Sequence, residues 1–341
     1  MCITPQQALE RIIRRQDLSQ DEMIELMRQM LRGDVPEAAT SAILIGLRVK
    51  RETIAEITGA AYALRECAQR IPVANTRALV DIVGTGGDGL RTFNISTCAM
   101  FVVAAAGGCV AKHGSRSVTS KSGSADVLEA LDARIDLQPE AVARIIDAAG
   151  VGFVCAPTHH PALQKIAPLR RMLGVRTLFN ILGPLANPAR PPNIVLGVFH
   201  FKLVPLLAQV LQNLGVARAL VVHGRDGMDE LSIGASSLVA ELRDGVITEY
   251  EVHPEDFSIP MASCRHLQVD SPQQSCERIH AVLAGQQGPL LDVVVLNAGA
   301  ALYVSGVAND WSEGIAKARD AIHSGLARAK LAEYLAQTHS V

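Results

Sequence analysis

The chain has 341 residues, of which 49% are hydrophobic, 19% charged and only 4% aromatic. This apolar composition excludes a disordered protein, and the formal net charge of −2 argues against a protein that coats nucleic acid or an anionic membrane. We expect a large α/β domain with a smaller one. No uncharged apolar stretch of about 18 residues and no signal peptide is found, so we expect a soluble, cytoplasmic protein.

The seven cysteines are scattered and never form a Cys-x-x-Cys pair. We therefore predict reduced thiols rather than disulfides or a zinc site. None of them lies in a context that marks a nucleophile.

The first seventy residues have helical patterns. Thr4 and Ser19 each precede a Gln or Glu by three positions, which is the capping-box pattern of a helix start, and further starts lie at 34–37 and 52–54. The region has no strand pattern. We predict a small N-terminal α-helical domain over 1–75 that either covers the next domain or pairs with another copy of itself.

From residue 78 the pattern changes, because short apolar runs alternate with helical stretches. The predicted strands are 79–83, 109–111, 152–155, 194–199 and 219–223. The predicted helices include 96–106, 124–131, 139–149 and 203–214. This alternation predicts a large α/β domain over 76–341 with a mostly parallel central sheet flanked by helices.

Three further features complete this second domain. A hairpin is expected around 238–250, a buried apolar helix at 291–303, and a closing helix or helix pair after Trp311. The segment 159–192 is helical at first and then rich in Pro and Asn, and we expect it to return to the helical domain.

The candidate ligand site lies between Asp81 and Asp126. The strand at 79–83 leads into the loop GTGGDG at 84–89, and NIST at 94–97 opens a helix. This order collects backbone N–H groups around a phosphate. A second polar cluster follows at 112–124, which indicates a ligand with two separated phosphate groups. The loop is neither a Walker motif nor a dinucleotide fingerprint, and alone it also fits tight packing.

Several motifs occur together and in order over nearly the whole chain: GTGGD, NIST, KHGxRSVTSKSGSAD, HHPA, RRMLGVRTLFNILGPLANP and DGMDELS. Together they closely resemble the anthranilate phosphoribosyltransferase family of class III phosphoribosyltransferases. The resemblance implies transfer of the 5-phosphoribosyl group from 5-phosphoribosyl 1-pyrophosphate to the amine of anthranilate, in tryptophan biosynthesis. It also implies Mg²⁺, two ions per subunit, and a homodimer formed through the helical domain, with no nucleic acid or membrane partner.

The resemblance further assigns roles to individual residues. Phosphate and pyrophosphate groups are expected at Gly84, Thr85, Gly86, Gly87, Asp88, Thr92, Asn94, Ser96, Thr97, Lys112 and Ser124. Anthranilate is expected at Gly84, His113, Ser115, His160 and Arg170, and the metal at Ser96, Asp229 and Glu230. No residue is expected to act as a catalytic acid, base or nucleophile, because an aryl amine is already neutral and nucleophilic at pH 7.

Some residues keep a second interpretation. The two histidines at 113 and 160 also fit polar loop packing. Arg171 and Arg176, which share a motif with Arg170, are expected to be structural and to bind helix ends or carboxylates. Asp229 and Glu230, read alone, also fit a solvated turn.

Two positions depart from the family pattern. Ser115 stands where the family usually has Asn, and Ser is shorter but keeps a donor and two acceptor lone pairs, so we expect a modest loss of affinity for the acceptor. Cys155 stands where a larger apolar residue is usual.

Two other functions stay open. One is a pyrimidine nucleoside phosphorylase of the same fold, and the other is a relative without enzyme activity that binds nucleic acid. The slightly acidic charge and the intact loops disfavour the second.

Overall fold

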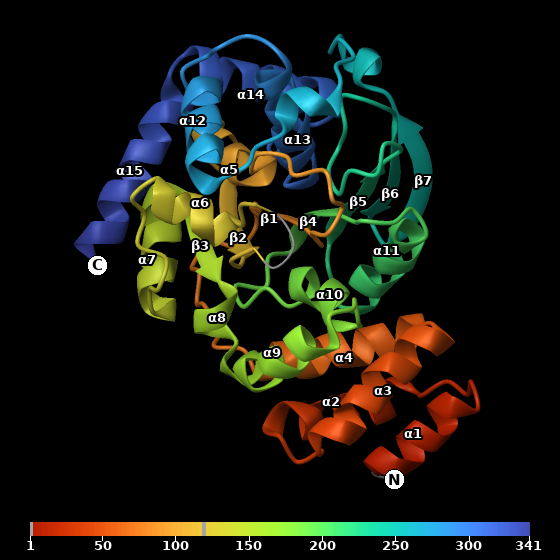
Figure 1. Cartoon of the computed structure of the whole chain (residues 1–341). Helices are drawn as coiled ribbons and strands as arrows, with labels where there is room; N and C mark the ends of the chain where they lie inside the picture. Colours follow the sequence, from red (N-terminus) through yellow and green to blue (C-terminus); the bar gives the residue numbers. More distant parts are fainter. Residues whose placement is uncertain (1–2, 118–120) are drawn as a thin grey trace.

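The structure is a computed structural model that describes residues 3–117 and 121–341. Four helices form a bundle at its N-terminal end (Figure 1): α1 (Pro5–Ile13), α2 (Gln20–Arg32), α3 (Glu37–Lys50) and α4 (Ile54–Glu66). The capping boxes predicted at Thr4 and Ser19 are formed, and Thr53 forms another at the start of α4. These side chains satisfy N–H groups that a helix start leaves without partners.

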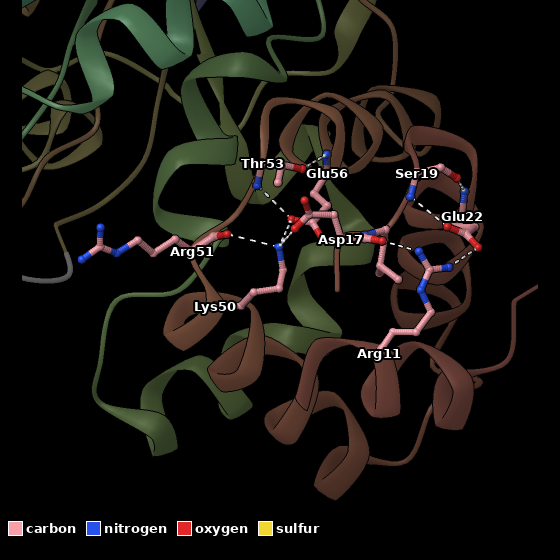
Figure 2. A network of polar contacts seen from close by, with 9 residues as sticks. Arg11, Asp17, Ser19, Glu22, Lys50, Arg51, Thr53 and Glu56 are labelled. Atoms are coloured by element: carbon pink, nitrogen blue, oxygen red, sulfur yellow. Dashed lines mark hydrogen bonds and ion pairs between the residues drawn. The ribbon is translucent and has the colours of Figure 1, made fainter. Parts of the chain in front are cut away.

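A buried ion group joins the helix ends of this bundle (Figure 2). The side chains of Lys50 and Glu56 are only 3% and 0% exposed. The Lys50 ammonium donates to Asp17 Oδ1 at 2.6 Å and to Glu56 Oε2 at 3.0 Å. Its third hydrogen bond goes to the Arg51 carbonyl oxygen at 3.2 Å. Glu56 also accepts the Leu18 N–H at 2.9 Å, so the group ties the α1–α2 loop to the α3–α4 turn.

Arg51, the capping residue that directly follows α3, has φ 75° and ψ 122°. Residues with a Cβ rarely adopt this conformation, which costs them about 1–3 kcal/mol. We expect Arg51→Gly to raise the free energy of unfolding by about 1 kcal/mol, because the relief of strain exceeds the added entropy of the unfolded chain. Urea unfolding measures the change. Arg51→Ala is the matched control, since Ala keeps the strain; an equal gain in both variants would contradict the backbone explanation.

Seven strands form one sheet in the order β3-β2-β1-β4-β5-β6-β7. They are β1 (Leu79–Gly84), β2 (Cys109–Gly114), β3 (Val151–Cys155), β4 (Asn193–Gly197), β5 (Arg218–Gly224), β6 (Ser237–Arg243) and β7 (Val246–Val252). The pairs among β1 to β5 are parallel, and β5, β6 and β7 pair antiparallel. The mostly parallel sheet and the hairpin are therefore confirmed, and the five parallel strands end at one edge.

The second strand is longer than predicted. The apolar pattern ends at residue 111, but β2 continues to Gly114 because Lys112 pairs with Phe153 and His113 with Val154 of β3. Both polar side chains find hydrogen-bond partners inside the protein, so the strand does not end where the apolar run ends. As a result these two candidate site residues lie on a strand and not in a loop.

Helices cover both faces of the sheet (Figure 1). One face carries α5 (Ile95–Ala105), α6 (Ser124–Ala130), α7 (Pro139–Ala149), α12 (Pro272–Leu283), α13 (Pro289–Val304), α14 (Trp311–His323) and α15 (Leu326–Ser340). The other carries α9 (Pro161–Leu173), α10 (Phe179–Leu182), α11 (Leu203–Asn213) and the N-terminal bundle, and α8 (Ala156–His159) precedes α9. Side chains alternate between the faces: Ile194 and Leu196 of β4 point to the bundle side, and Val195 points to the opposite core.

The segment between β3 and β4 lies between the bundle and the sheet (Figure 1). Within it, α9 packs against α2 and α3, and the short 3-10 helix η1 (Gly183–Leu185) follows α10. Arg65 of α4 donates to the carbonyl oxygen of Leu185 in η1 at 2.6 Å. Tyr62 of α4 also donates to the carbonyl oxygen of Asn213, the last residue of α11, at 2.9 Å. The boundary between the two domains near residue 75 stays a prediction.

Two short 3-10 helices, η2 (Pro254–Phe257) and η3 (Cys264–Leu267), lie in the connection after β7. The six cysteines in the described ranges are free. Over the same ranges, no helix has both the length and the apolar character needed to cross a membrane.

Candidate active site

The glycine-rich loop at 84–89 follows β1, at the edge where the parallel strands end. Gly86, Gly87 and Gly89 have φ values of 70°, 80° and 80°, which residues with a Cβ adopt only at a cost. Asp88 Oδ1 accepts the Leu90 N–H at 3.1 Å and so closes the loop on itself. The backbone N–H groups of such a loop form a concavity that binds anions.

Thr85 attaches this loop to the end of β4. Its N–H donates to the Gly197 carbonyl oxygen at 2.9 Å, and its Oγ1 accepts the Phe199 N–H at 3.0 Å. The Thr85 N–H is therefore committed to the end of β4, whereas the Thr85 hydroxyl, which accepts one hydrogen bond there, can still donate its own hydrogen to an anion.

Asp229 and Glu230 follow β5 and reach the loop and the start of α5. Asp229 Oδ2 accepts the Gly86 N–H at 2.6 Å, and Glu230 Oε1 accepts the Ser96 N–H at 3.2 Å. Burial raises the pKa of both carboxyl groups, and repulsion from Asp88 raises that of Asp229 further. Glu230 Oε2 is buried and has no hydrogen-bond partner among the described residues.

This pair fits a divalent cation, because an unpartnered, buried carboxylate oxygen and two adjacent, partly buried acids are both costly without one. Among the described residues, no three or more His, Cys, Asp or Glu side chains form a metal-binding group. Mg²⁺ suits such a site, since it is often bound by one or two carboxylates together with water and substrate phosphates. A Cβ at Gly197 would lie 1.6 Å from the Asp229 carbonyl oxygen, so only glycine there admits the pair.

Lys112 lies beneath the loop and is 1% exposed. Its ammonium donates to the Ile82 carbonyl oxygen at 2.6 Å and to Ser96 Oγ at 3.0 Å. Burial lowers the pKa of Lys112, and the nearby carboxylates, Asp81 first, oppose this effect. The structure thus brings Lys112, Ser96 and the acid pair together, as predicted, although the lysine is covered by protein.

Asp81 and Asn187 are supporting residues that sequence reasoning did not assign. Asp81 is fully buried in β1; its Oδ1 accepts the His113 N–H at 3.1 Å and its Oδ2 accepts a hydrogen bond from Asn187 Nδ2 at 2.8 Å. Burial raises the pKa of Asp81 to about 6. An acid within the apolar run at 79–83 was the available signal for Asp81, whereas nothing in the sequence pointed to its partner.

Asn94 precedes α5 and holds two other segments. Its Oδ1 accepts hydrogen bonds from Ser122 Oγ and from Ser275 Oγ, both at 2.7 Å. The amide therefore joins the loop before α6 to α12. A contact between Asn94 and phosphate stays a prediction.

Three further predicted phosphate-binding residues lie in the connection before α5 or in the first turns of α5 and α6. Thr97 Oγ1 is buried and has no partner among the described residues. Thr92 forms a single bridge with Gln268, and Ser124 is the first residue of α6. Residues 118–120 of the KHG motif block lie outside the described ranges.

The two predicted acceptor histidines pack together, with ring centres 5.1 Å apart. His113 Nδ1 lies 3.0 Å from the Gly183 carbonyl oxygen, and because a carbonyl only accepts, Nδ1 carries the proton. His113 Nε2 is then an acceptor, and it has no partner in the described ranges. Burial lowers the pKa of His113 well below its usual range and that of His160 to about 4, so both rings are neutral.

Arg170 and Ser115 are the other two side chains predicted to bind the acceptor. Arg170 in α9 is partly buried, and its guanidinium lies 5.6 Å from the centre of the Phe179 ring. Burial lowers the pKa of Arg170, and no carboxylate among the described residues pairs with it. Such a cation suits an incoming carboxylate. Ser115 is exposed and donates to the Arg116 carbonyl oxygen at 3.1 Å.

The chain is similar to known proteins over its whole length. Residues 76–328 match the family model described as "Glycosyl transferase family, a/b domain", and residues 6–68 match the corresponding "helical bundle domain". An anthranilate phosphoribosyltransferase of Stenotrophomonas maltophilia is 59% identical over 341 residues, which cover 100% of this chain and 99% of that relative. The chain belongs to the anthranilate phosphoribosyltransferase family.

Solved structures of the family have the same fold. The anthranilate phosphoribosyltransferase of Thermus thermophilus is 41% identical with a TM-score of 0.92, over 97% of this chain and 99% of that one. That of Saccharomyces cerevisiae, in complex with PRPP and Mg, is 25% identical with a TM-score of 0.90, over 99% and 98%. As a member of the anthranilate phosphoribosyltransferase family, the chain is a glycosyltransferase of tryptophan biosynthesis.

Proposed function

We propose that the chain transfers the 5-phosphoribosyl group of 5-phosphoribosyl 1-pyrophosphate (PRPP) to the amine of anthranilate at the edge where β1, β2 and β5 end. One observation carries the proposal: the glycine loop, the hydrogen-bonded Lys112 and Ser96, and the acid pair Asp229 and Glu230 lie together at that edge. Ligands of open α/β sheets bind beyond the carboxyl ends of the strands. The three elements there supply anion-binding N–H groups, a buried cation and metal-binding carboxylates.

On the donor side, the backbone of 84–87 would bind the pyrophosphate. Ser96, Asp229 and Glu230 would hold magnesium, and the number of two ions rests on the family resemblance. When bound, Mg²⁺ would neutralise negative charge on the pyrophosphate. Lys112 would add a positive charge below the loop and orient the Ser96 hydroxyl through their hydrogen bond.

On the acceptor side, Arg170 would bind the anthranilate carboxylate by a planar fork of N–H donors. The neutral rings of His113 and His160 would contact the flat aromatic ring. The amine lone pair forms a bond to C1 of the ribose, the C1–O bond breaks, and its electron pair leaves with pyrophosphate. The new secondary amine then loses one proton. Catalysis here would consist of positioning and charge stabilisation.

We also propose a homodimer formed through the helical bundle. Ile13 at the end of α1 and Val49 near the end of α3 are 70% and 68% exposed, and because α1 packs against α3, two exposed apolar side chains are available to a partner on this part of the bundle. Analytical ultracentrifugation of the full chain measures the oligomeric state. A cytoplasmic location stays a prediction.

The activity is tested by mixing the protein with anthranilate, PRPP and Mg²⁺ and following the loss of anthranilate fluorescence. We expect a loss that needs all three components. Release of thymine from thymidine and phosphate, without any loss of anthranilate, would instead support a nucleoside phosphorylase.

Ser115→Asn tests the departure from the family pattern. We expect the KM for anthranilate to fall about two- to fivefold, because the longer amide makes a hydrogen bond that is worth about 0.5–1 kcal/mol. The KM for PRPP should stay unchanged and serves as the internal control. An unaltered KM for anthranilate would show that position 115 does not contact the acceptor.

A further inference from the structure

Arg176, just after α9, connects the glycine loop to the helical bundle. Its Nη2 donates to the Gly87 carbonyl oxygen, and its guanidinium lies 4.2 Å from the centre of the Phe199 ring. Its own carbonyl oxygen accepts a hydrogen bond from Nη1 of Arg48 in α3. The Phe199 N–H donates to Thr85 Oγ1, so the guanidinium contacts the loop directly at Gly87 and stacks on a residue that is itself bonded to the loop.

The Arg176 guanidinium lies close to Gly87 in the middle of the loop. A Cβ added at Gly87 would lie 3.2 Å from Nη2, 3.4 Å from Nε and 3.5 Å from Cζ of Arg176. An anion held by the N–H groups of the loop would therefore lie within a few ångströms of a full positive charge. Opposite charges attract each other at such distances, although solvent screens the attraction at an exposed side chain.

The Arg176 guanidinium also keeps N–H donors that can bind a ligand. Arg176 is exposed and forms no ion pair with a carboxylate of the described residues, and its hydrogen bond to Gly87 uses one of five N–H donors. Stacking on Phe199 fixes the plane of the fork, so little rotational freedom remains to be lost on binding. A fixed, planar, unpaired guanidinium is the group that recognises phosphate oxygens in pairs.

We propose that Arg176 binds the pyrophosphate end of the sugar donor beside the glycine loop, as a residue supplied from the segment after α9. The proposal rests on the proposed function, because it assumes a pyrophosphate in this loop. The leaving group would be held by loop N–H groups on one side and by this guanidinium on the other. Because Arg48 holds the Arg176 backbone, this contact also links the helical bundle to the donor site.

The test compares three variants by calorimetric titration with inorganic pyrophosphate and Mg²⁺. Arg176→Gln keeps an N–H donor for Gly87 but loses the charge, and we expect about tenfold weaker binding, as for loss of a charge-assisted hydrogen bond. Arg176→Lys keeps the charge without the fork, and we expect about a threefold loss. Arg171→Gln is the matched control: it removes an exposed Arg of α9 that makes no contact with the loop in the described structure, and binding should stay within twofold of the parent.

Steady-state kinetics separates a binding role from a structural one. We expect Arg176→Gln to raise the KM for PRPP while the KM for anthranilate stays unchanged, and Arg176→Lys to restore most of the difference. Pyrophosphate binding by Arg176→Gln within twofold of the parent, or equal losses in the Gln and Lys variants, would overturn the proposal. If the parent consumes no anthranilate but binds pyrophosphate in an Arg176-dependent way, the proposed function fails while this inference stands.

Discussion

Asp229→Asn combined with Glu230→Gln should lower turnover about a thousandfold, a loss of roughly 4 kcal/mol of transition-state stabilisation. The amides keep the size and the hydrogen-bond acceptors for Gly86 and Ser96 but remove both negative charges, so the fold should remain and the metal site should not. Loss of anthranilate fluorescence over a range of Mg²⁺ concentrations measures the effect.

Thermal unfolding supplies a second readout of the same double variant. Mg²⁺ and pyrophosphate together should raise the Tm of the parent, because ligands that bind only the folded state stabilise it, and should leave the Tm of the variant unchanged. The matched control is Glu255→Gln with Asp256→Asn, which makes the same change at two neighbouring, exposed acids in η2. This control variant should keep the parental turnover. Full activity of the Asp229–Glu230 variant would refute the metal assignment.

Lys50→Met should lower the free energy of unfolding by about 3–5 kcal/mol, because it leaves a buried carboxylate without its cation. Glu56 would keep hydrogen bonds from the backbone N–H groups of Leu18 and Thr53, which do not balance a full charge. Urea unfolding measures the change. Lys50→Met with Glu56→Gln is the control that removes both charges and should recover most of the loss; no recovery would show that packing, and not the charge, is responsible.

The stability that Lys50 contributes should also depend on pH, and it should fall in strong alkali. Burial alone would lower the pKa of Lys50, but hydrogen bonds to Asp17 and Glu56 outweigh it and the pKa is raised. A raised lysine pKa contributes stability that is fully present below its unfolded value, about 10.5, and is lost as the pH rises above it. The difference between parent and Lys50→Met should therefore be constant from neutral pH to about pH 9 and shrink only in stronger alkali.

Local signals made much of the fold predictable. The helix predicted at 139–149 has the observed bounds of α7, because Pro139 marks its first turn and Gly150 its end. The glycine loop is also predictable from local signals, because an apolar strand, a run of glycines and a helix start follow one another in the chain. The acid pair was found by family resemblance and not by pattern, because two neighbouring acids alone also fit an exposed turn.

The remaining features depend on contacts between distant residues. Asn187 bonds to Asp81 from 106 positions away, and the guanidinium of Arg176 reaches Gly87 from 89 positions away. No periodicity or spacing encodes such pairs. Sequence reasoning also placed Lys112 after a strand rather than in it, since a buried lysine breaks the apolar pattern and is tolerated only where a carbonyl and a hydroxyl accept its protons.

The hydrogen bond between the Gly86 N–H and Asp229 has a thermodynamic consequence for ligand binding. One N–H group cannot fully serve a protein carboxylate and a pyrophosphate oxygen at once, so Asp229 is an internal competitor for the donor. A cation that draws this carboxylate away from the loop would increase donor affinity, and by linkage the donor would increase cation affinity by the same factor. The glycine loop therefore makes the two affinities interdependent even without direct contact between the two ligands.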